Sequence, residues 1–183
     1  MKLEKHADYI FLLPTSELDR IKKHKIARMF LQYIVSAIND DGDNEIKINK
    51  FGRPYFVHKN IYFSISYSSN LICLAISNLN ISIDCELMKK IEFIPISDRL
   101  FSTSEKTSIK HSEDYDTFYT IWCSKEASLK YIGIGLRGGK KMMNDLSCYV
   151  LSQKNLNKKV LNYGGYKIIV LHNNKVLHII EYL

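Results

Sequence analysis

The sequence lacks an apolar run that could span a bilayer, since its longest run is only Leu71 to Ile76. Near the N-terminus, Ile10 to Leu13 is too short for the core of a signal peptide. The sequence also lacks a CxxC motif and any Cys/His spacing typical of zinc sites. We therefore expect a cytoplasmic protein without a membrane or zinc site. Its cysteines should be reduced, buried thiols: Cys73, Cys85, Cys123 and Cys148.

Nucleotide-binding glycine motifs are missing as well. The segment 132–139, IGIGLRGG, matches neither a Rossmann nor a P-loop pattern in order or context, so it predicts a helix stop and a loop. The turn from Asp40 to Glu45 has the spacing of a calcium loop, but Phe51 falls where an EF-hand needs its last glutamate. Internal repeats and low-complexity tracts are also absent from the sequence.

The 183 residues suffice for one domain or for two small lobes. Hydrophobic residues make up 46% and charged residues 25%, which is typical of a globular protein. Lys and Arg number 26 against 19 Asp and Glu, and the net charge of +7 favours an anionic partner: nucleic acid, a phosphorylated small molecule or an acidic protein. If there are two lobes, they would be residues 1–90 and 91–183, joined near Lys89 to Pro95.

The first half of the chain predicts one long helix among strands. Thr15 or Ser16 can cap a helix that runs to about Ile38. Phe51 to Pro54 and Tyr67 to Asn70 read as turns. Strands are expected at Tyr9–Leu13, Glu45–Asn49, Ile61–Ser66 and Leu71–Ser77. The early turns of the helix carry a basic cluster, which is either a solvated face or the rim of a phosphate site: Arg20, Lys22, Lys23, Lys25 and Arg28.

The second half predicts two helices and then strands. Ser102 and Glu105 form a capping box that opens a short helix. A longer helix contains Ile121 to Lys130, with Asp114 or Asp116 as its cap and Gly133 and Gly135 as its stop. Strands are expected at Leu146–Leu151, Tyr166–Leu171 and Val176–Ile180, and the last two read as a hairpin across residues 172–175.

The segment Ile81 to Leu87 alternates strictly between apolar and polar residues, as in a strand with one buried face. Asp84 and Glu86 therefore project side by side from the polar face. Two carboxylates so placed repel each other unless a cation compensates them, and Mg²⁺ commonly binds one or two carboxylates together with phosphate oxygens. The alternative is an exposed strand face with solvated acids.

In the longer helix, Trp122, Glu126 and Lys130 are four residues apart and share one side. Taken alone, this stripe is typical of a surface Glu–Lys pair, which contributes a few tenths of a kcal/mol. A second acidic cluster, Asp84 and Glu86, makes a functional site a further possibility.

Five short motifs in order give the sequence a family resemblance: FGRP, SYS, DCE, FSTSE and WCSKEASLK, starting at Phe51, Ser66, Asp84, Phe101 and Trp122. Together they resemble the G-[KR]-P, S-H-S, D-x-E, F-S-x-x-E and W-x-x-K-E-x-x-x-K motifs of the Sfp-type 4′-phosphopantetheinyl transferases. The resemblance covers roughly Arg28 to Leu136. It implies an α+β fold of two pseudo-symmetric lobes, each a long helix packed on a small antiparallel sheet, with coenzyme A bound between them.

The resemblance also implies an activity: transfer of 4′-phosphopantetheine from coenzyme A to a serine of an apo carrier protein, with release of adenosine 3′,5′-bisphosphate. The carrier is of acyl, peptidyl or polyketide type. We expect a monomer with coenzyme A and an acidic carrier protein as partners, and without a nucleic-acid partner. The implied Mg²⁺ or Mn²⁺ ligands are Asp84, Glu86 and Glu126.

The remaining site residues follow from the same motifs. Catalytic roles fall on Glu126, Lys130 and Glu105. Within the coenzyme A set, the turn of Gly52 to Pro54 would border the adenine, Arg28 and Ser66 would face the 3′-phosphate, and Lys130 would meet the pyrophosphate. The full coenzyme A set is Arg28, Gly52, Arg53, Pro54, Ser66, Tyr67, Lys125 and Lys130.

One position departs from the motifs, because Tyr67 stands where the family has a histidine. Tyrosine donates a hydrogen bond but carries no positive charge at neutral pH, so we expect weaker binding of the 3′-phosphate. Alternatives to the transferase are a non-catalytic protein that binds coenzyme A or the carrier, a metal-dependent nuclease and a basic interaction domain. A nuclease would need an acid-x-Lys element, which is missing after Glu86.

Overall fold

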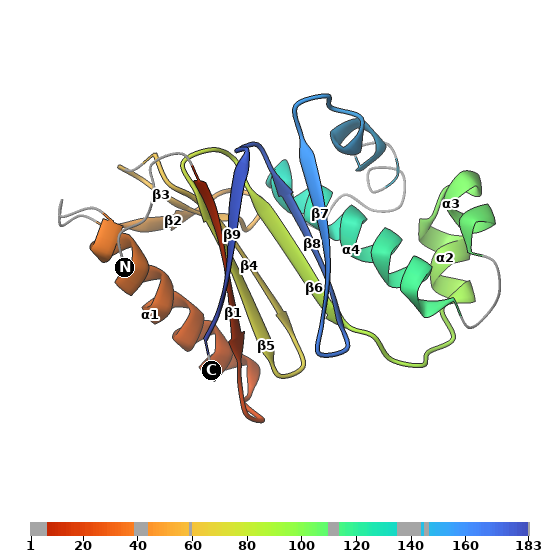
Figure 1. Ribbon diagram of the computed structural model, residues 1–183, viewed down its shortest axis with the longest axis horizontal. Helices are drawn as coiled ribbons and strands as arrows, with labels where there is room; N and C mark the ends of the chain where they lie inside the picture. Colours follow the sequence, from red (N-terminus) through yellow and green to blue (C-terminus); the bar gives the residue numbers. More distant parts are fainter. Residues whose placement is uncertain are drawn as a thin grey trace.

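The computed structural model describes residues 7–38, 44–58, 60–109, 114–134, 144 and 147–182. Within them the chain is a mixed α+β protein (Figure 1). The strands are β1 (Ala7–Pro14), β2 (Ile46–Ile48), β3 (Pro54–Phe56), β4 (Tyr62–Ser68), β5 (Leu71–Ser77), β6 (Ser82–Leu87), β7 (Asn157–Tyr163), β8 (Tyr166–His172) and β9 (Val176–Glu181). The helices with full bounds are α1 (Arg20–Ile38), α2 (Ile94–Leu100), α3 (Thr103–Ser108) and α4 (Tyr115–Tyr131).

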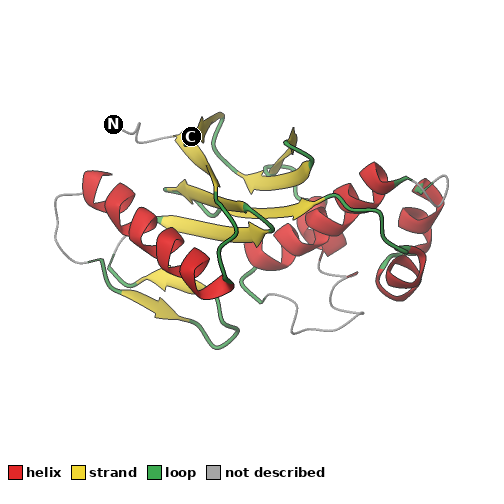
Figure 2. Ribbon diagram, turned by 90° about the horizontal axis from the view of Figure 1, so that it is seen from below, coloured by secondary structure: helices red, strands yellow, loops and turns green. Residues whose placement is uncertain are grey.

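Two main sheets lie between the two long helices. The first has the strand order β4-β5-β1-β9, the second has the order β6-β8-β7, and β2 and β3 form a small separate ribbon. Helix α1 lies on one side of the strands, and α4, with α2 and α3 beyond it, lies on the other side (Figure 1). Figure 2 shows the same separation of α1 and α4 from below.

The alternation of side chains along β1 and β8 explains how the helices and the two sheets stack in layers. On β1, Tyr9 and Phe11 join the core under α1, whereas Ile10 and Leu12 join the core between the two sheets. On β8, Ile168 and Val170 face that same middle core, whereas Ile169 and Leu171 pack with α4. Both strands are therefore apolar on both faces, as expected for strands that are covered on each side. An aromatic cluster joins α4 to the α2–α3 segment: Phe93, Phe101, Phe118 and Tyr119.

Local signals for α4 and α3 are confirmed. Asp114 caps α4 by accepting a hydrogen bond from the Thr117 amide at 3.2 Å. The helix ends before Gly133, whose φ of +79° is a conformation that favours glycine. Ser102 and Glu105 make both hydrogen bonds of the predicted capping box at the start of α3. Residues 135–140 and 40–43, which include the rest of the glycine segment and most of the acidic turn, lie outside the described residues.

Other predictions about elements are wrong. The segment predicted as a strand at Leu146–Leu151 is helical at 147–151, and Leu146 lies outside the described residues. The predicted hairpin of the last two strands does not form, because β8 pairs with β6 and β7, whereas β9 runs parallel to β1. Instead, β8 forms a hairpin with β7 across Gly164 and Gly165, which both have positive φ. Helix α2 was not predicted, and Tyr67 belongs to β4 rather than to a turn.

Strand pairing crosses the predicted boundary between the two lobes at residue 90. Strand β6 precedes that boundary but pairs with β8, and β9 follows it but pairs with β1. The first sheet is also not purely antiparallel, because the β1–β9 pair is parallel. The pseudo-symmetry of the two halves stays a prediction. None of the described helices is long and apolar enough to cross a membrane.

Candidate active site

The candidate site lies where the edges of the two sheets meet, between β4 and β6. We call this boundary the β4–β6 seam, formed by residues 64–68 and 83–87. Three alternate serines of β4 accept hydrogen bonds from alternate backbone amides of β6. The pairs are Ser64 with Ile83 at 3.1 Å, Ser66 with Cys85 at 3.2 Å, and Ser68 with Leu87 at 2.9 Å. Because β4 and β6 belong to different sheets, these hydroxyls satisfy amides that a neighbouring strand would otherwise bind.

The same serines orient the two acids of β6. Ser66 donates to Asp84 Oδ1 at 2.9 Å, and Ser68 donates to Glu86 Oε2 at 2.8 Å. The alternation predicted from the sequence is confirmed, because Ile83 and Cys85 join the middle core on the opposite face. The acids are nevertheless not on a solvated strand face: Asp84 is buried and Glu86 is partly buried.

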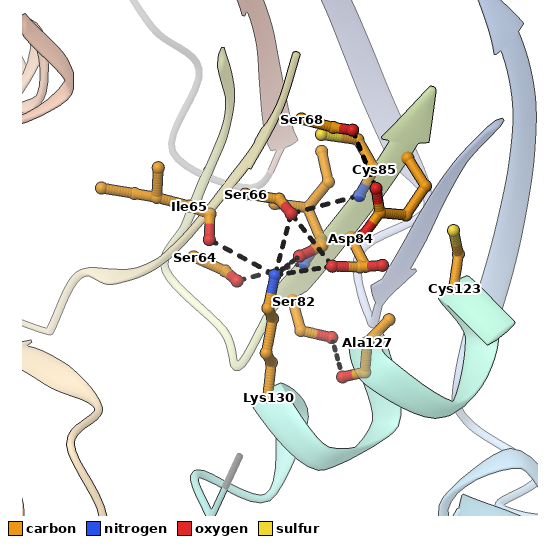
Figure 3. Close-up of polar contacts among 12 residues, drawn as sticks. Ser64, Ile65, Ser66, Ser68, Ser82, Asp84, Cys85, Cys123, Ala127 and Lys130 are labelled. Carbon is orange, nitrogen blue, oxygen red and sulfur yellow. Dashed lines mark hydrogen bonds and ion pairs between the residues drawn. The ribbon is translucent and has the colours of Figure 1, made fainter. Parts of the chain in front are cut away.

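Lys130 reaches into the seam from α4 (Figure 3). Its Nζ lies 2.7 Å from Asp84 Oδ1 and 2.9 Å from Ser66 Oγ, and it also donates to the carbonyl oxygen of Ile83 at 3.2 Å. Burial lowers the pKa of Lys130, but the attraction and hydrogen bond of Asp84 outweigh this, so that its pKa lies above the ordinary value. Lys130 is therefore a partly buried, charged partner of the buried Asp84 and not part of a surface pair.

The other two acids of the site, Glu126 and Glu86, have raised pKa values. Burial, together with repulsion from Asp84 and Glu86 and against the attraction of Lys130, raises the pKa of Glu126 to about 7. Burial and Asp84 also raise the pKa of Glu86, against hydrogen bonds from Ser68 and Trp122. Glu126 and Lys130 on α4 are thus electrostatically coupled to Asp84 and Glu86 on β6 in the folded protein.

These observations fit a site for a cation. Asp84 Oδ2 is buried and has no hydrogen-bond partner among the described residues. A buried acceptor without a donor costs about 1–3 kcal/mol, and a metal ion would satisfy it. Burial and neighbouring carboxylates raise the pKa values of Glu86 and Glu126, and a nearby cation would favour their charged forms. In their present positions, however, no three Asp, Glu, His or Cys side chains in the described part of the chain could hold one ion together.

A cavity of about 400 Å³ opens beside the seam. Lys130 is the link between the two, because its side chain lines the cavity and also bonds Asp84. Six residues predicted to bind coenzyme A line this cavity: Arg28, Gly52, Arg53, Pro54, Tyr67 and Lys130. The ribbon of β2 and β3 and helix α1 supply much of the remaining wall, including Leu31, Ile46, Ile48 and Phe51. The cavity therefore has apolar walls with basic groups among them.

Tyr67, the residue in place of the family histidine, packs against an imidazole from α1. The rings of Tyr67 and His24 lie 4.4 Å apart between centroids, and both line the cavity. Burial raises the pKa of Tyr67 to about 12, against the opposing charges of Lys130, Arg28 and Arg20. Tyr67 thus remains a neutral hydroxyl among three basic side chains.

Three predicted site residues have other contacts. Lys125 is fully buried; its Nζ lies 2.9 Å from Glu105 Oε2 and donates to Asn144 Oδ1 at 2.7 Å. Glu105 also closes the capping box of α3, so this pair ties α3 to α4. Ser66 is not among the residues that line the cavity, because its hydroxyl points into the seam. These contacts favour positioning roles for all three.

Sequence reasoning missed several residues that shape the site. Ser64 was read only as part of a strand and Ser68 only as part of a turn, although Ser64, Ser66 and Ser68 alternate regularly. Cys148 was expected to be buried but is exposed, whereas the other three cysteines are buried as predicted. His24 was not singled out within the basic helix, although it lines the cavity.

Comparison with known proteins identifies the family. Residues 80–176 match the 4′-phosphopantetheinyl transferase superfamily, which is more than half of the chain. The chain therefore belongs to this superfamily.

Curated relatives bear the same name. A 4′-phosphopantetheinyl transferase of Aneurinibacillus migulanus is 30% identical over 109 residues, which cover 57% of this chain and 45% of the relative. One from Bacillus subtilis is 36% identical over 93 residues, covering 49% and 41% respectively. The Sfp protein of Bacillus subtilis strain 168 is 31% identical over 101 residues, covering 53% and 45%. The chain thus spans less than half the length of the relatives it matches.

Proposed function

We propose that this protein transfers 4′-phosphopantetheine from coenzyme A to a serine hydroxyl of an apo carrier protein, and releases adenosine 3′,5′-bisphosphate. One observation carries the proposal beyond family membership: Lys130 lines an apolar cavity that contains basic groups, and it also bonds Asp84 in the acidic seam. A polyanion in that cavity would lie next to the carboxylates, which is the juxtaposition that phosphoryl transfer requires.

In this proposal the carrier serine oxygen attacks the phosphorus that bears the pantetheine arm. The new P–O bond replaces the bond to the bridging oxygen of the pyrophosphate, and adenosine 3′,5′-bisphosphate leaves with that oxygen. Glu126 takes the serine proton, directly or through water. In the absence of a bound cation, the pKa of Glu126 is about 7, so this carboxyl can take up a proton near neutral pH. Lys130 offsets the charge that develops on the phosphate oxygens.

Asp84, Glu86 and Glu126 would hold a Mg²⁺ or Mn²⁺ ion. When bound, such an ion supplies charge neutralisation at the pyrophosphate. The remaining tasks belong to the chain itself. Ser66 and Ser68 orient Asp84 and Glu86 through their hydroxyls, and the ion pair of the buried Lys125 with Glu105 keeps α3 against α4. At the cavity, Arg28 and the Tyr67 hydroxyl provide donors for the ligand phosphates.

The decisive experiment is incubation with coenzyme A, Mg²⁺ and a panel of apo carrier proteins of acyl, peptidyl and polyketide type. Mass spectrometry should show a carrier that gains one phosphopantetheine, and the gain should disappear with EDTA and return with added Mg²⁺ or Mn²⁺. A protein that is stabilised by coenzyme A but modifies no carrier would instead be a non-catalytic binding homologue. Stabilisation by an oligonucleotide and not by coenzyme A would refute both readings.

A further inference from the structure

The end of helix α4 is held by three side chains that we call the α4 clamp: Asn49, Arg53 and Asn80. Arg53 Nη1 donates to the Tyr131 carbonyl oxygen at 2.9 Å, and Asn80 Nδ2 donates to the same oxygen at 2.9 Å. Asn49 Nδ2 donates to the carbonyl oxygen of Gly133 at 3.2 Å. The clamp therefore occupies carbonyl groups that the end of a helix leaves without intrahelical partners.

Arg53 joins this helix end to the start of β6. Its Nη2 donates to Asn80 Oδ1 at 2.9 Å and to the Ile81 carbonyl oxygen at 3.4 Å, while its Nη1 holds Tyr131. A planar guanidinium presents several donors in a fixed fork, which a single ammonium does not reproduce. Its charge also suits the negative end of the helix dipole.

The backbone at Gly133 lies close to the Arg53 side chain. Gly133 has a φ of +79°, and a Cβ added there would lie 3.2 Å from Arg53 Cδ. Asn49 fixes the other side of the contact, because its Oδ1 accepts from the Arg53 amide at 2.8 Å. The turn at the cavity rim, the end of α4 and the start of β6 thus meet at one side chain.

We propose that Arg53 is a positioning residue, which fixes Lys130 on Asp84 by locking the end of α4 to the start of β6. Lys130 directly precedes Tyr131, and Asp84 lies three residues after Ile81, so the clamp contacts the chain next to both partners. The proposal rests on the proposed transferase function. It assigns the Arg53 side chain to the protein's own geometry, whereas the resemblance implied a contact with coenzyme A.

A direct ligand contact is the rival explanation, because Arg53 also lines the cavity. A substitution of Asn80 distinguishes the positioning role of Arg53 from a direct ligand contact. Asn80 donates to Tyr131 and accepts from Arg53, but it is not among the described residues that line the cavity. Removing its amide therefore weakens the clamp without removing a cavity wall.

The test compares Asn80→Ala, Arg53→Met and Arg53→Lys with Asn157→Ala, a control at an exposed position of β7. If the clamp positions Lys130, Asn80→Ala should lower kcat by about 10- to 100-fold, since a displacement of about 1 Å can cost that much. The dissociation constant for coenzyme A, measured by calorimetry, should change by less than about threefold. Arg53→Lys should not restore the kcat lost in Arg53→Met, because lysine lacks the fork.

Hydrogen exchange gives a readout that does not depend on turnover. Backbone amides at 130–134 should exchange faster in Asn80→Ala and Arg53→Met than in the control, with the other helices unchanged. A normal kcat in Asn80→Ala, or unchanged exchange at 130–134, would overturn the proposal. Wild-type protein that modifies no carrier would refute the transferase function instead, so the two failures are distinguishable.

Discussion

Glu126→Gln should make the protein more stable at alkaline pH, although it removes the proposed base. The substitution keeps the shape of the side chain and removes its charge. Burial, with Asp84 and Glu86, raises the pKa of Glu126 from 4.5 to about 7 in the folded protein. The folded state therefore binds this proton more tightly than the unfolded state does, and ionisation opposes folding.

The sign and size follow from that shift. Below about pH 4.5 both states are protonated and the carboxyl costs nothing. Between about pH 4.5 and pH 7 only the unfolded chain releases the proton, so the free energy of unfolding falls as the pH rises. Above about pH 7 the full cost is present, and a difference of 2.5 pKa units corresponds to about 3 kcal/mol. Glu126→Gln should therefore equal the wild type near pH 4 and exceed it by up to about 3 kcal/mol at pH 8.

Urea denaturation measures this difference. The only tryptophan, Trp122, lies on α4 and reports unfolding by its fluorescence. Titrations from about pH 4 to pH 8 with EDTA present should include Glu92→Gln, a matched substitution at an exposed position. Because the wild type and Glu126→Gln share every other titrating group, the difference between their free energies of unfolding reports on Glu126 alone. A difference that stays constant with pH, or that favours the wild type above pH 7, would refute the reasoning.

Three further substitutions test the seam and the cavity. Asp84→Asn should abolish carrier modification while circular dichroism stays native; full activity would exclude Asp84 as a metal ligand. Ser68→Ala should destabilise the protein by about 1–3 kcal/mol, since it leaves the Leu87 amide without its acceptor, and an unchanged urea midpoint would contradict the serine pairing. Tyr67→His should tighten coenzyme A by a few-fold at about pH 6 and less at pH 8, because histidine is protonated near pH 6. Dephospho-coenzyme A should show no such gain in calorimetry, and an equal gain would remove Tyr67 from the 3′-phosphate site.

The parts of the site that follow local periodicity could be predicted from the sequence. Alternation from Ile81 to Leu87 placed Asp84 and Glu86 on one face, and that face is where both acids lie. Caps at Asp114 and Ser102 marked the starts of α4 and α3 correctly. These signals involve neighbours within a few residues, so the backbone geometry alone decides them.

Strand partners could not be predicted in the same way. An alternating pattern identifies a strand but does not name its neighbour, so β8 and β9 were read as a hairpin although they belong to different sheets. The serine pairing of the seam depends on that same arrangement. Ser64, Ser66 and Ser68 form hydrogen bonds with β6 only because β4 and β6 end up as facing edges of two sheets.

The charges of the seam lead to a last prediction, about divalent cations. Among the described residues, the carboxyl groups of Asp84, Glu86 and Glu126 interact with the ammonium of Lys130, which keeps its proton because Asp84 raises its pKa. A bound cation would remove the repulsion that raises the pKa of Glu126, and it would bind the folded state alone. Mg²⁺ should therefore stabilise the wild type at pH 8, where Glu126 is ionised, more than at pH 5, where it is protonated. Glu126→Gln should lose most of this dependence on pH in urea titrations with Mg²⁺ and with EDTA. Equal stabilisation of both proteins at both pH values would place the ion away from Glu126.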